Sequence, residues 1–392
     1  MNRNRTLLFL SFLSFFLLGI GASLMGIAWP SVRHTFGLSL DAIGWLLLTS
    51  TSGFFLASVS AGRLISRWGI GRLLLTAAGL FATGLAAQAA APSWWLMVAA
   101  AGLAGWASGA IDAGFNVTIA ADYSARVMNW MHGFFGVGAT AGPLMMTAVL
   151  NQGWSWRVGF GLLACWFAAV AIHFAFMGKR LGNPAASSAA AQPATSYRQT
   201  GQQPIVWLGI LLFFIYSGIE GTAGQWTYSL FTEARGVQSD AAGYWVSLYW
   251  GGLTAGRLLL GTAVHWIGAV RLVQLSMAGV VAGTLLLWPD TAVFNISGMI
   301  LTGFSLAAIF PTLMSLTPER VTPAHAANAI GFQTGAASLG IAFLPGLAGV
   351  LADGWGLETI IPFMLAAAVL LGLVHQLALV RANGRQPAGA LP

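Results

Sequence analysis

Residues 183–204 read NPAASSAAAQPATSYRQTGQQP and form the one long polar stretch in an otherwise apolar chain. On both sides of it, apolar runs of about 20 residues recur, and a run of this length crosses a bilayer as a helix. Six such runs precede the stretch and six follow it. The sequence therefore predicts an all-α membrane protein with twelve transmembrane helices, joined in the middle by a flexible cytoplasmic linker at 179–203.

The hydropathy pattern also gives expected bounds for the two halves and for the twelve spans. A six-helix N-terminal half is expected at 1–178 and a six-helix C-terminal half at 204–392. The expected spans are 6–30, 43–64, 72–92, 96–120, 127–150, 157–177, 204–230, 240–262, 271–288, 294–316, 325–352 and 357–380.

Composition excludes several classes of function. Only 7% of the 392 residues are charged and 57% are hydrophobic, whereas a soluble domain carries about 25% charged residues. So few charges cannot cover a soluble globule, and a soluble enzyme is excluded. The net charge of +7 is explained by basic residues on cytoplasmic loops, so no nucleic-acid partner is expected.

The basic residues also predict the orientation of the chain. Most of the 17 Lys and Arg residues, including Arg3, Arg5, Lys179 and Arg180, fall on the side of both termini. Because basic residues resist translocation, both termini are expected in the cytoplasm. Arg180 after the single lysine also excludes a GK[ST] phosphate loop, and with it ATP-driven transport by this chain.

Two motifs recur between the halves. Gly62-x6-Gly69-x2-Arg72 recurs as Gly261-x6-Gly268-x2-Arg271, and Gly133-x4-Gly138-x4-Pro143 recurs as Gly335-x4-Gly340-x4-Pro345. The offsets are 199 and 202 residues, and each pair occupies equivalent places in the two halves. The chain is therefore predicted to be a duplicated bundle of six plus six helices.

This architecture resembles the major facilitator superfamily along the whole chain. The superfamily's loop signature, roughly G-x-L-a-D-r-x-G-r, corresponds to residues 62–70, with Ser66 at the acidic position. The resemblance implies two pseudo-symmetric six-helix halves, alternating access and a monomer. It also implies a gating role for basic residues, for which the candidates are Arg63, Arg67, Arg72 and Arg257.

Within the superfamily, two strings resemble the bacterial sugar:proton symporters of the glucose/mannose and fucose permease branch. Span seven contains Y-x-G-x-E-x3-G-x-W from Tyr216 to Trp226, and span eight contains Y-W-G-G-x4-G-R from Tyr249 to Arg257. In that branch, acidic residues bind sugar hydroxyls and carry the coupled proton, and aromatic rings stack on the sugar. The resemblance implies the same roles here.

Asp112 and Glu220 are the two acidic residues within spans, since the other eight fall at loops or span ends. A carboxylate in hydrocarbon costs at least about 2.5–3.5 kcal/mol, so it normally faces the bundle interior and marks a pathway. We expect Glu220 or Asp112 to bind substrate and to carry the coupled proton. The alternative is a structural buried pair with Arg257 or a hydroxyl group.

Several polar and aromatic side chains accompany these carboxylates. Asn116 lies one turn after Asp112, and Tyr216 lies one turn before Glu220. Carboxylate and carboxamide groups suit a polyol, although a clamp between helices explains Asp112 and Asn116 as well. Glycines around Glu220 either loosen span seven, so that it breaks near the site, or serve helix packing.

Further candidates line the expected site. The remaining substrate-binding candidates are Gln225, Trp226, Tyr249, Trp250 and Gln333. For Trp250 and Gln333, packing is a comparable alternative. Arg257 either snorkels to the interface or pairs with a carboxylate. His132 lies near the cytoplasmic start of span five and is more often structural than a proton relay.

The function expected is a secondary active transporter that imports a small neutral solute, such as a monosaccharide, by proton symport. The alternative is a proton-antiport exporter of drugs or metabolites. No nucleophile, metal cluster or cofactor motif is present in the sequence, so neither an enzyme nor a cofactor is predicted. The expected surroundings are the bilayer of a bacterial cytoplasmic (inner) membrane.

Overall fold

The computed structural model describes residues 3–177 and 196–383 as a bundle of long helices. The first six are α1 (Arg3–Phe36), α2 (Ile43–Trp68), α3 (Ile70–Ala90), α4 (Trp94–Asp122), α5 (Ala125–Asn151) and α6 (Trp156–Met177). After the short α7 (Tyr197–Gly201) come α8 (Pro204–Ser229), α9 (Ser239–Ile267), α10 (Ala269–Leu286), α11 (Ala292–Leu306), α12 (Ile309–Arg320), α13 (Pro323–Trp355) and α14 (Ile360–Asn383). Most of the predicted linker, from 179 to 195, lies outside the described residues.

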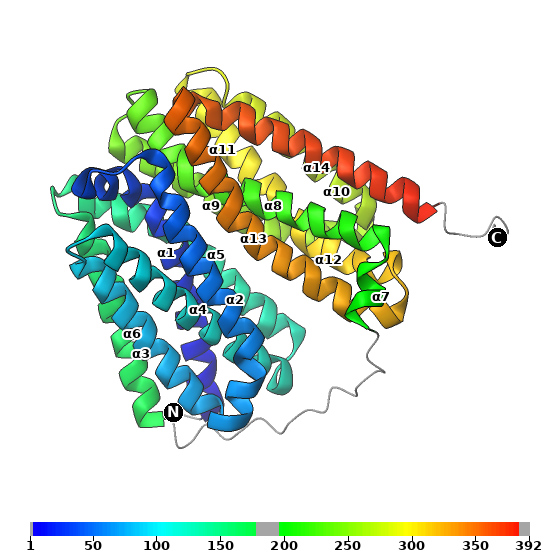
Figure 1. The fold of residues 1–392 in the computed structure, drawn as a ribbon, viewed down its shortest axis with the longest axis horizontal. Coiled ribbons are helices and arrows are strands. Elements are labelled where there is room, and N and C mark those ends of the chain that lie inside the picture. Colours follow the sequence, from blue (N-terminus) through cyan, green and yellow to red (C-terminus); the bar gives the residue numbers. More distant parts are fainter. Residues whose placement is uncertain (1–2, 178–195, 384–392) are drawn as a thin grey trace.

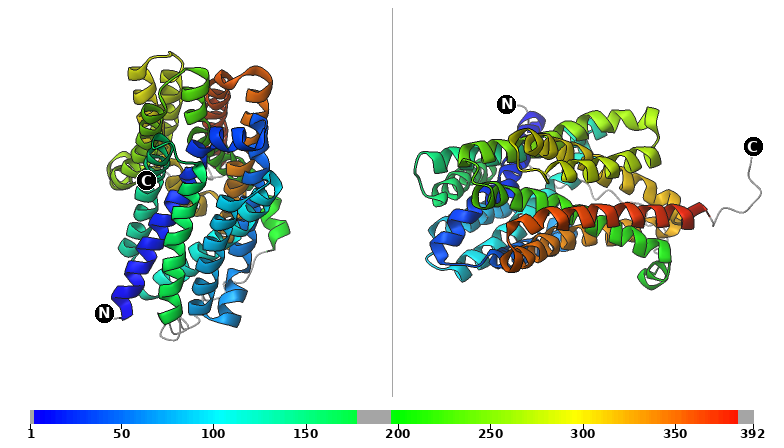
Figure 2. Two further views of the ribbon diagram at one scale, coloured as in Figure 1. Left: turned by 90° about the vertical axis from the view of Figure 1, so that its left-hand side faces the viewer. Right: turned by 90° about the horizontal axis from the view of Figure 1, so that it is seen from above.

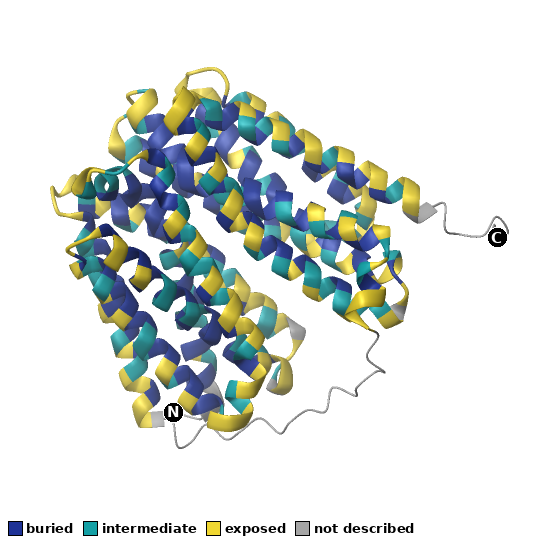
Figure 3. Cartoon of the chain, viewed as in Figure 1, coloured by how far each residue is buried: buried dark blue, intermediate teal, exposed yellow. Residues whose placement is uncertain are grey.

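The twelve-helix membrane fold is confirmed. Eleven segments are long and apolar enough to cross a membrane. The twelfth, α9, has 29 residues and carries Arg257 together with several glycines and tyrosines, which lower its hydropathy. Large apolar side chains such as Phe176, Trp266 and Val380 are exposed on the outer surface, as expected where lipid replaces water. Figure 3 shows how exposed and buried residues alternate along the helices.

The helices divide into two groups, α1–α6 and α8–α14, each held by its own contacts (Figures 1 and 2). Between the groups, α5 packs against α9, α2 against α13 and α1 against α8. These contacts use small residues: Gly44 faces Gly346, Gly136 faces Thr254, and Gly243 faces Thr147. The groups meet at one end and diverge towards the end that carries the linker (Figure 1).

The first repeated motif has the same geometry in both halves. Gly69 ends α2 with φ +77°, and its N–H bonds to Ile65 O at 2.9 Å. Gly268 ends α9 with φ +82°, and its N–H bonds to Val264 O at 3.0 Å. Because L side chains rarely adopt these positive φ values, each motif needs glycine at this turn.

The second motif serves close helix packing. A Cβ on Gly138 of α5 would lie 1.9 Å from Phe16 O of α1, and a Cβ on Gly340 of α13 would lie 2.0 Å from Phe214 O of α8. Only glycine permits the two backbones to approach this closely. Equivalent helix pairs therefore have equivalent close contacts, which accounts for the repeat physically.

Of the two roles left open for the glycines of span seven, the structure shows helix packing rather than a break. Helix α8 is continuous to Ser229 and is extended by a π-helical turn at 230–234. Its glycines instead admit neighbouring side chains, since Gly218 faces Leu344 and Gly224 faces Trp250. The break lies in span ten, between α11 and α12, next to Pro311, whose missing N–H removes a helical hydrogen bond.

Candidate functional site

Glu220 lies at the centre of a polar cluster between α8 and α9. The hydroxyl of Tyr216, one turn earlier on α8, donates a short hydrogen bond to Glu220 Oε2. Arg257 Nη2 on α9 lies 3.7 Å from Glu220 Oε1, and Tyr249 donates to the backbone oxygen of Glu220 at 3.0 Å. The Glu220 side chain is 13% exposed and that of Arg257 is 36% exposed, so the ion pair is within reach of a solute.

Arg257 therefore pairs with a carboxylate in this structure. Its sequence position left open whether it snorkels to the interface or forms such a pair. Because its partner is Glu220, Arg257 belongs to this polar cluster rather than to the exposed arginines at the ends of α2 and α3. A gating role for Arg257 stays a prediction.

Asp112 lies in a second polar cluster, between α4 and α5. Asn116 Nδ2 donates to Asp112 Oδ2 at 3.1 Å, as their one-turn spacing suggests. His132 of α5 lies with its Nε2 3.1 Å from Asn116 Oδ1, and its ring packs edge-on against Phe15 of α1. No described residue forms an ion pair with Asp112.

The two clusters approach each other across the contact between α5 and α9. Gly136 of α5 lies one turn from His132, and Thr254 of α9 lies one turn from Arg257. Gly136 and Thr254 are in contact. His132 and Arg257 are close enough to interact electrostatically. The Asp112 cluster and the Glu220 cluster thus lie on the two sides of the α5–α9 contact, and the first includes an exposed histidine that sequence reasoning left out of the site.

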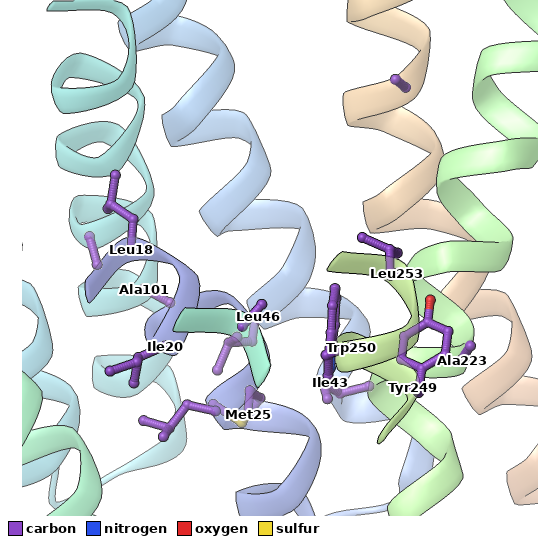
Figure 4. Close-up of a cluster of buried hydrophobic side chains, with 14 of the residues drawn as sticks. Leu18, Ile20, Met25, Ile43, Leu46, Ala101, Ala223, Tyr249, Trp250 and Leu253 are labelled. Carbon is purple, nitrogen blue, oxygen red and sulfur yellow. The ribbon is translucent and has the colours of Figure 1, made fainter. Parts of the chain in front are cut away.

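The aromatic candidates lie around the Glu220 cluster at different depths. Tyr249 and Trp250 are buried on α9, beside Ala223 of α8 (Figure 4). Gly224 makes room for the Trp250 indole, whose N–H has no partner among the described residues. Trp226 is fully buried and donates to Pro345 O at 2.8 Å, which ties α8 to α13 and leaves no ring face for a ligand.

Two amide candidates lie apart from the carboxylates. Gln225 is buried where α8 meets Gly26 of α1, and its Nε2 has no hydrogen-bond partner in the described part of the chain. Gln333 of α13 accepts from Thr317 at 2.8 Å and touches Gly209 of α8. Gly209 precedes Glu220 by eleven residues, about 16 Å along a helix, so Gln333 does not join the Glu220 cluster.

The predicted gating arginines Arg63, Arg67 and Arg72 are exposed at the ends of α2 and α3. None of them forms an ion pair with a described residue, and Ser66, at the acidic position of the signature, donates to the backbone oxygen of Arg63. They lie at the end where the halves diverge. Their gating role stays a prediction.

The opposite end holds contacts that the sequence analysis did not predict. Arg33, at the end of α1, forms a short ion pair with Glu233 in the π-helical turn after α8. The backbone N–H of Leu40 donates to Asp353 Oδ1 of α13 at 2.9 Å. Arg33 and Glu233 are 200 residues apart and belong to different halves, so no local sequence pattern indicates this pair.

A cavity of about 610 Å³ lies between α2 and α13 on the diverging side. Its lining is mostly apolar, with Phe55 and Phe332 on opposite walls and the hydroxyl residues Thr51, Ser52 and Ser338 among them. Glu220 and Asp112 do not line it. Among the described residues, no group of three or more His, Cys, Asp or Glu residues could hold a metal ion.

The comparisons with known proteins agree with this architecture. The Major Facilitator Superfamily matches residues 11–289 and 226–390, and the chain belongs to this family. It is a multi-pass membrane transporter of a small-molecule substrate rather than an enzyme.

Individual relatives are distant but match most of the chain. It is 24% identical to a glucose/galactose transporter of Brucella abortus over 88% of this chain and 87% of that protein. It is 23% identical to the glucose/mannose transporter GlcP of Bacillus subtilis over 77% of each. The resemblance to sugar transporters is therefore confirmed as a relationship in sequence.

Solved structures support the fold. A mutant of the nucleoside transporter NupG superposes with a TM-score of 0.81 at 14% identity, covering 96% of this chain and all of the other. A bacterial homologue of the human lysosomal transporter Spinster, in an inward-facing and unoccupied conformation, superposes with a TM-score of 0.79 at 13% identity, covering 98% of each chain.

Proposed function

We propose that the chain imports a monosaccharide by proton symport, with the substrate held between the Glu220 cluster and the Asp112 cluster. The observation that carries this proposal is the presence of one carboxylate within the membrane spans of each half, in polar clusters on the two sides of the α5–α9 contact. Relatives that transport glucose with mannose or galactose support the choice of a sugar.

The donors and acceptors of the two clusters suit a polyol. Each sugar hydroxyl both donates and accepts, and the carboxylates accept while Arg257 and the Asn116 amide donate. Trp250 lies beside Gly224 and offers an apolar surface of the kind that packs on a sugar ring. Tyr216 and Tyr249 hold the side chain and backbone of Glu220 in place.

The proton is assigned to Asp112 within this proposal. Glu220 has the counter-charge of Arg257, whereas Asp112 has an amide and no ion-pair partner among the described residues. A carboxylate without a counter-charge is costly within a membrane, and proton uptake removes that cost. Asp112 therefore takes up the coupled proton, and Glu220 with Arg257 orients the sugar.

The proposal also includes the orientation of the chain in the membrane and the movement of its two halves. The linker end faces the cytoplasm of a bacterial inner membrane, both termini lie there, and the protein works as a monomer. Residues 1–178 and 204–392 rock about the site as two halves. The described conformation, closed at the Arg33–Glu233 end and diverging at the other, then corresponds to the state that releases substrate inside.

Uptake into proteoliposomes tests the function. Radiolabelled glucose, galactose, mannose and uridine are offered with an imposed inward proton gradient, in which each 100 mV contributes about 2.3 kcal/mol per charge. Accumulation of a hexose that collapses with a protonophore is the result expected. Accumulation of uridine alone, or efflux of a lipophilic cation without sugar uptake, contradicts the proposal and favours a nucleoside carrier or the exporter.

A further inference from the structure

His375 of α14 is a buried histidine outside the polar clusters described above. It is fully buried, in a helix that packs against α8 and α10. Neither Nδ1 nor Nε2 has a hydrogen-bond partner among the described residues. A neutral imidazole carries one donor and one acceptor, and buried polar groups of this kind are normally satisfied. His375 therefore calls for a polar partner from outside the described chain.

Arg320 is the charged group close to His375. It is the last residue of α12, is half-buried, and lies close enough to His375 for the two side chains to interact electrostatically. Its Nη2 is buried and also has no partner in the part of the chain that is described. Helices α12 and α14 both pack against α10, so the two unpartnered side chains lie in one region of the fold.

No carboxylate among the described residues forms an ion pair with Arg320, although Glu319 acts on it electrostatically. Glu319, adjacent in sequence, is exposed, and no described acidic residue lies within ion-pair distance of Arg320. Residues 1–2, 178–195 and 384–392 contain no Asp or Glu at all. Within the described residues, the buried Nη2 of Arg320 is thus left without a partner and is available to an anion from another molecule.

We propose that Arg320 and His375 form a binding site for a phosphate-type anion at the linker end of the C-terminal half. The planar guanidinium of Arg320 presents paired N–H donors that match phosphate oxygens, and the imidazole of His375 supplies a further N–H donor. The half-buried position of Arg320 gives the anion access, while His375 lies deeper. The anion is either the headgroup of an anionic phospholipid or free phosphate.

The position of the site suits an anion. The exposed arginines Arg63, Arg72, Arg271 and Arg381 lie at the same end of the bundle as Arg320. Basic residues at this depth attract anionic headgroups, and basic pockets between membrane helices bind them. A bound anion would link α12, which follows the break in span ten, to α14.

Thermal unfolding of the full-length protein in detergent tests the site. The Tm is measured in micelles doped with phosphatidylglycerol or with phosphatidylcholine, and separately with sodium phosphate against sodium chloride at equal ionic strength. A ligand that binds the folded state raises Tm with its concentration. The variants are Arg320→Gln, Arg320→Lys and His375→Asn, with Arg381→Gln as a control for an exposed arginine on α14.

Phosphatidylglycerol or phosphate should raise the Tm of the unmodified protein, and whichever does so names the source of the anion. Arg320→Gln should weaken binding roughly five- to tenfold, His375→Asn less, and Arg381→Gln less than about twofold. Arg320→Lys should retain weakened binding, which keeps the test informative if Arg320→Gln fails to fold. Equal effects of both lipids and no effect of phosphate, or equal losses in Arg320→Gln and Arg381→Gln, would overturn the proposal.

Discussion

Glu220 and Asp112 lie inside opposite halves of the same bundle, but their surroundings differ. Glu220 has a cation 3.7 Å away and a tyrosine hydroxyl donating to it. Asp112 has an amide, and behind the amide a histidine. A charge with a counter-ion can stay charged in a membrane interior, whereas a charge without one gains from taking up a proton. Under the proposed function, this difference assigns the orientation of substrate to Glu220 and the coupled proton to Asp112.

Removal of the cation should have the largest effect. In Arg257→Gln, Glu220 keeps its tyrosine but loses its counter-charge, and we expect a loss of about 1–3 kcal/mol of stability, because the pair is partly exposed. Sugar uptake should fall at least tenfold. The double variant Arg257→Gln/Glu220→Gln should recover most of the Tm but not the uptake, and Arg271→Gln should change neither.

Removal of one hydroxyl near Glu220 should have a smaller effect. In Tyr216→Phe, the ring is retained and one hydrogen bond to the carboxylate is lost, which costs about 0.5–1.5 kcal/mol because Glu220 keeps its contact with Arg257. We expect the apparent Kd for sugar to rise about tenfold, measured by quenching of tryptophan fluorescence. An unchanged Kd would mean that Glu220 does not contact the sugar.

The histidine tests the link between the two clusters. In His132→Phe, the contact with Asn116 is lost while the packing against Phe15 is retained, so we expect stability to change by less than about 1 kcal/mol. Gradient-driven accumulation should fall about threefold, with little change in sugar exchange. A change in exchange without a change in accumulation would remove His132 from the coupling chain.

Removal of the Arg33–Glu233 ion pair at the closed end should have the smallest effect. Arg33 and Glu233 are each more than a quarter exposed, so their pair contributes about 0.2–1 kcal/mol, a shift of up to about fivefold between conformations. The test uses the variant Cys165→Ser/Thr51→Cys, which removes the exposed native cysteine and places a thiol in the cavity. The rate at which an impermeant thiol reagent labels this position measures how far the cavity is open. Arg33→Gln should slow this labelling, and a faster rate would contradict the closed-end role.

The fold was largely predictable because hydropathy and the duplicated motifs are local signals. All twelve expected spans correspond to helices, and Gly69 and Gly268 end helices in the same conformation. The break in span ten was not predicted, although Pro311 could have indicated it. The glycines of span seven could not distinguish a helix break from close helix packing, because both use glycine.

The members of the two polar clusters were largely predictable from the sequence, whereas the Arg257–Glu220 pair was one of two alternatives. The cost of a carboxylate in a membrane singled out Glu220 and Asp112, and the four-residue spacing correctly joined Tyr216 and Asn116 to them. That pair joins two helices, so spacing along one helix could not decide between the pair and the alternative that Arg257 snorkels to the interface. Gln333 and Trp226 were included because they lie in membrane spans, and tertiary contacts now engage both elsewhere.

The most direct test of the assignment of the proton to Asp112 compares gradient-driven accumulation with sugar exchange in Asp112→Asn. Proteoliposomes with this variant, with Glu220→Gln and with the unmodified protein are compared for gradient-driven accumulation and for exchange of labelled against unlabelled sugar. Asp112→Asn should lose accumulation and keep exchange, whereas Glu220→Gln should lose both. Accumulation retained in Asp112→Asn, or lost with exchange intact in Glu220→Gln, would contradict the assignment of the proton to Asp112.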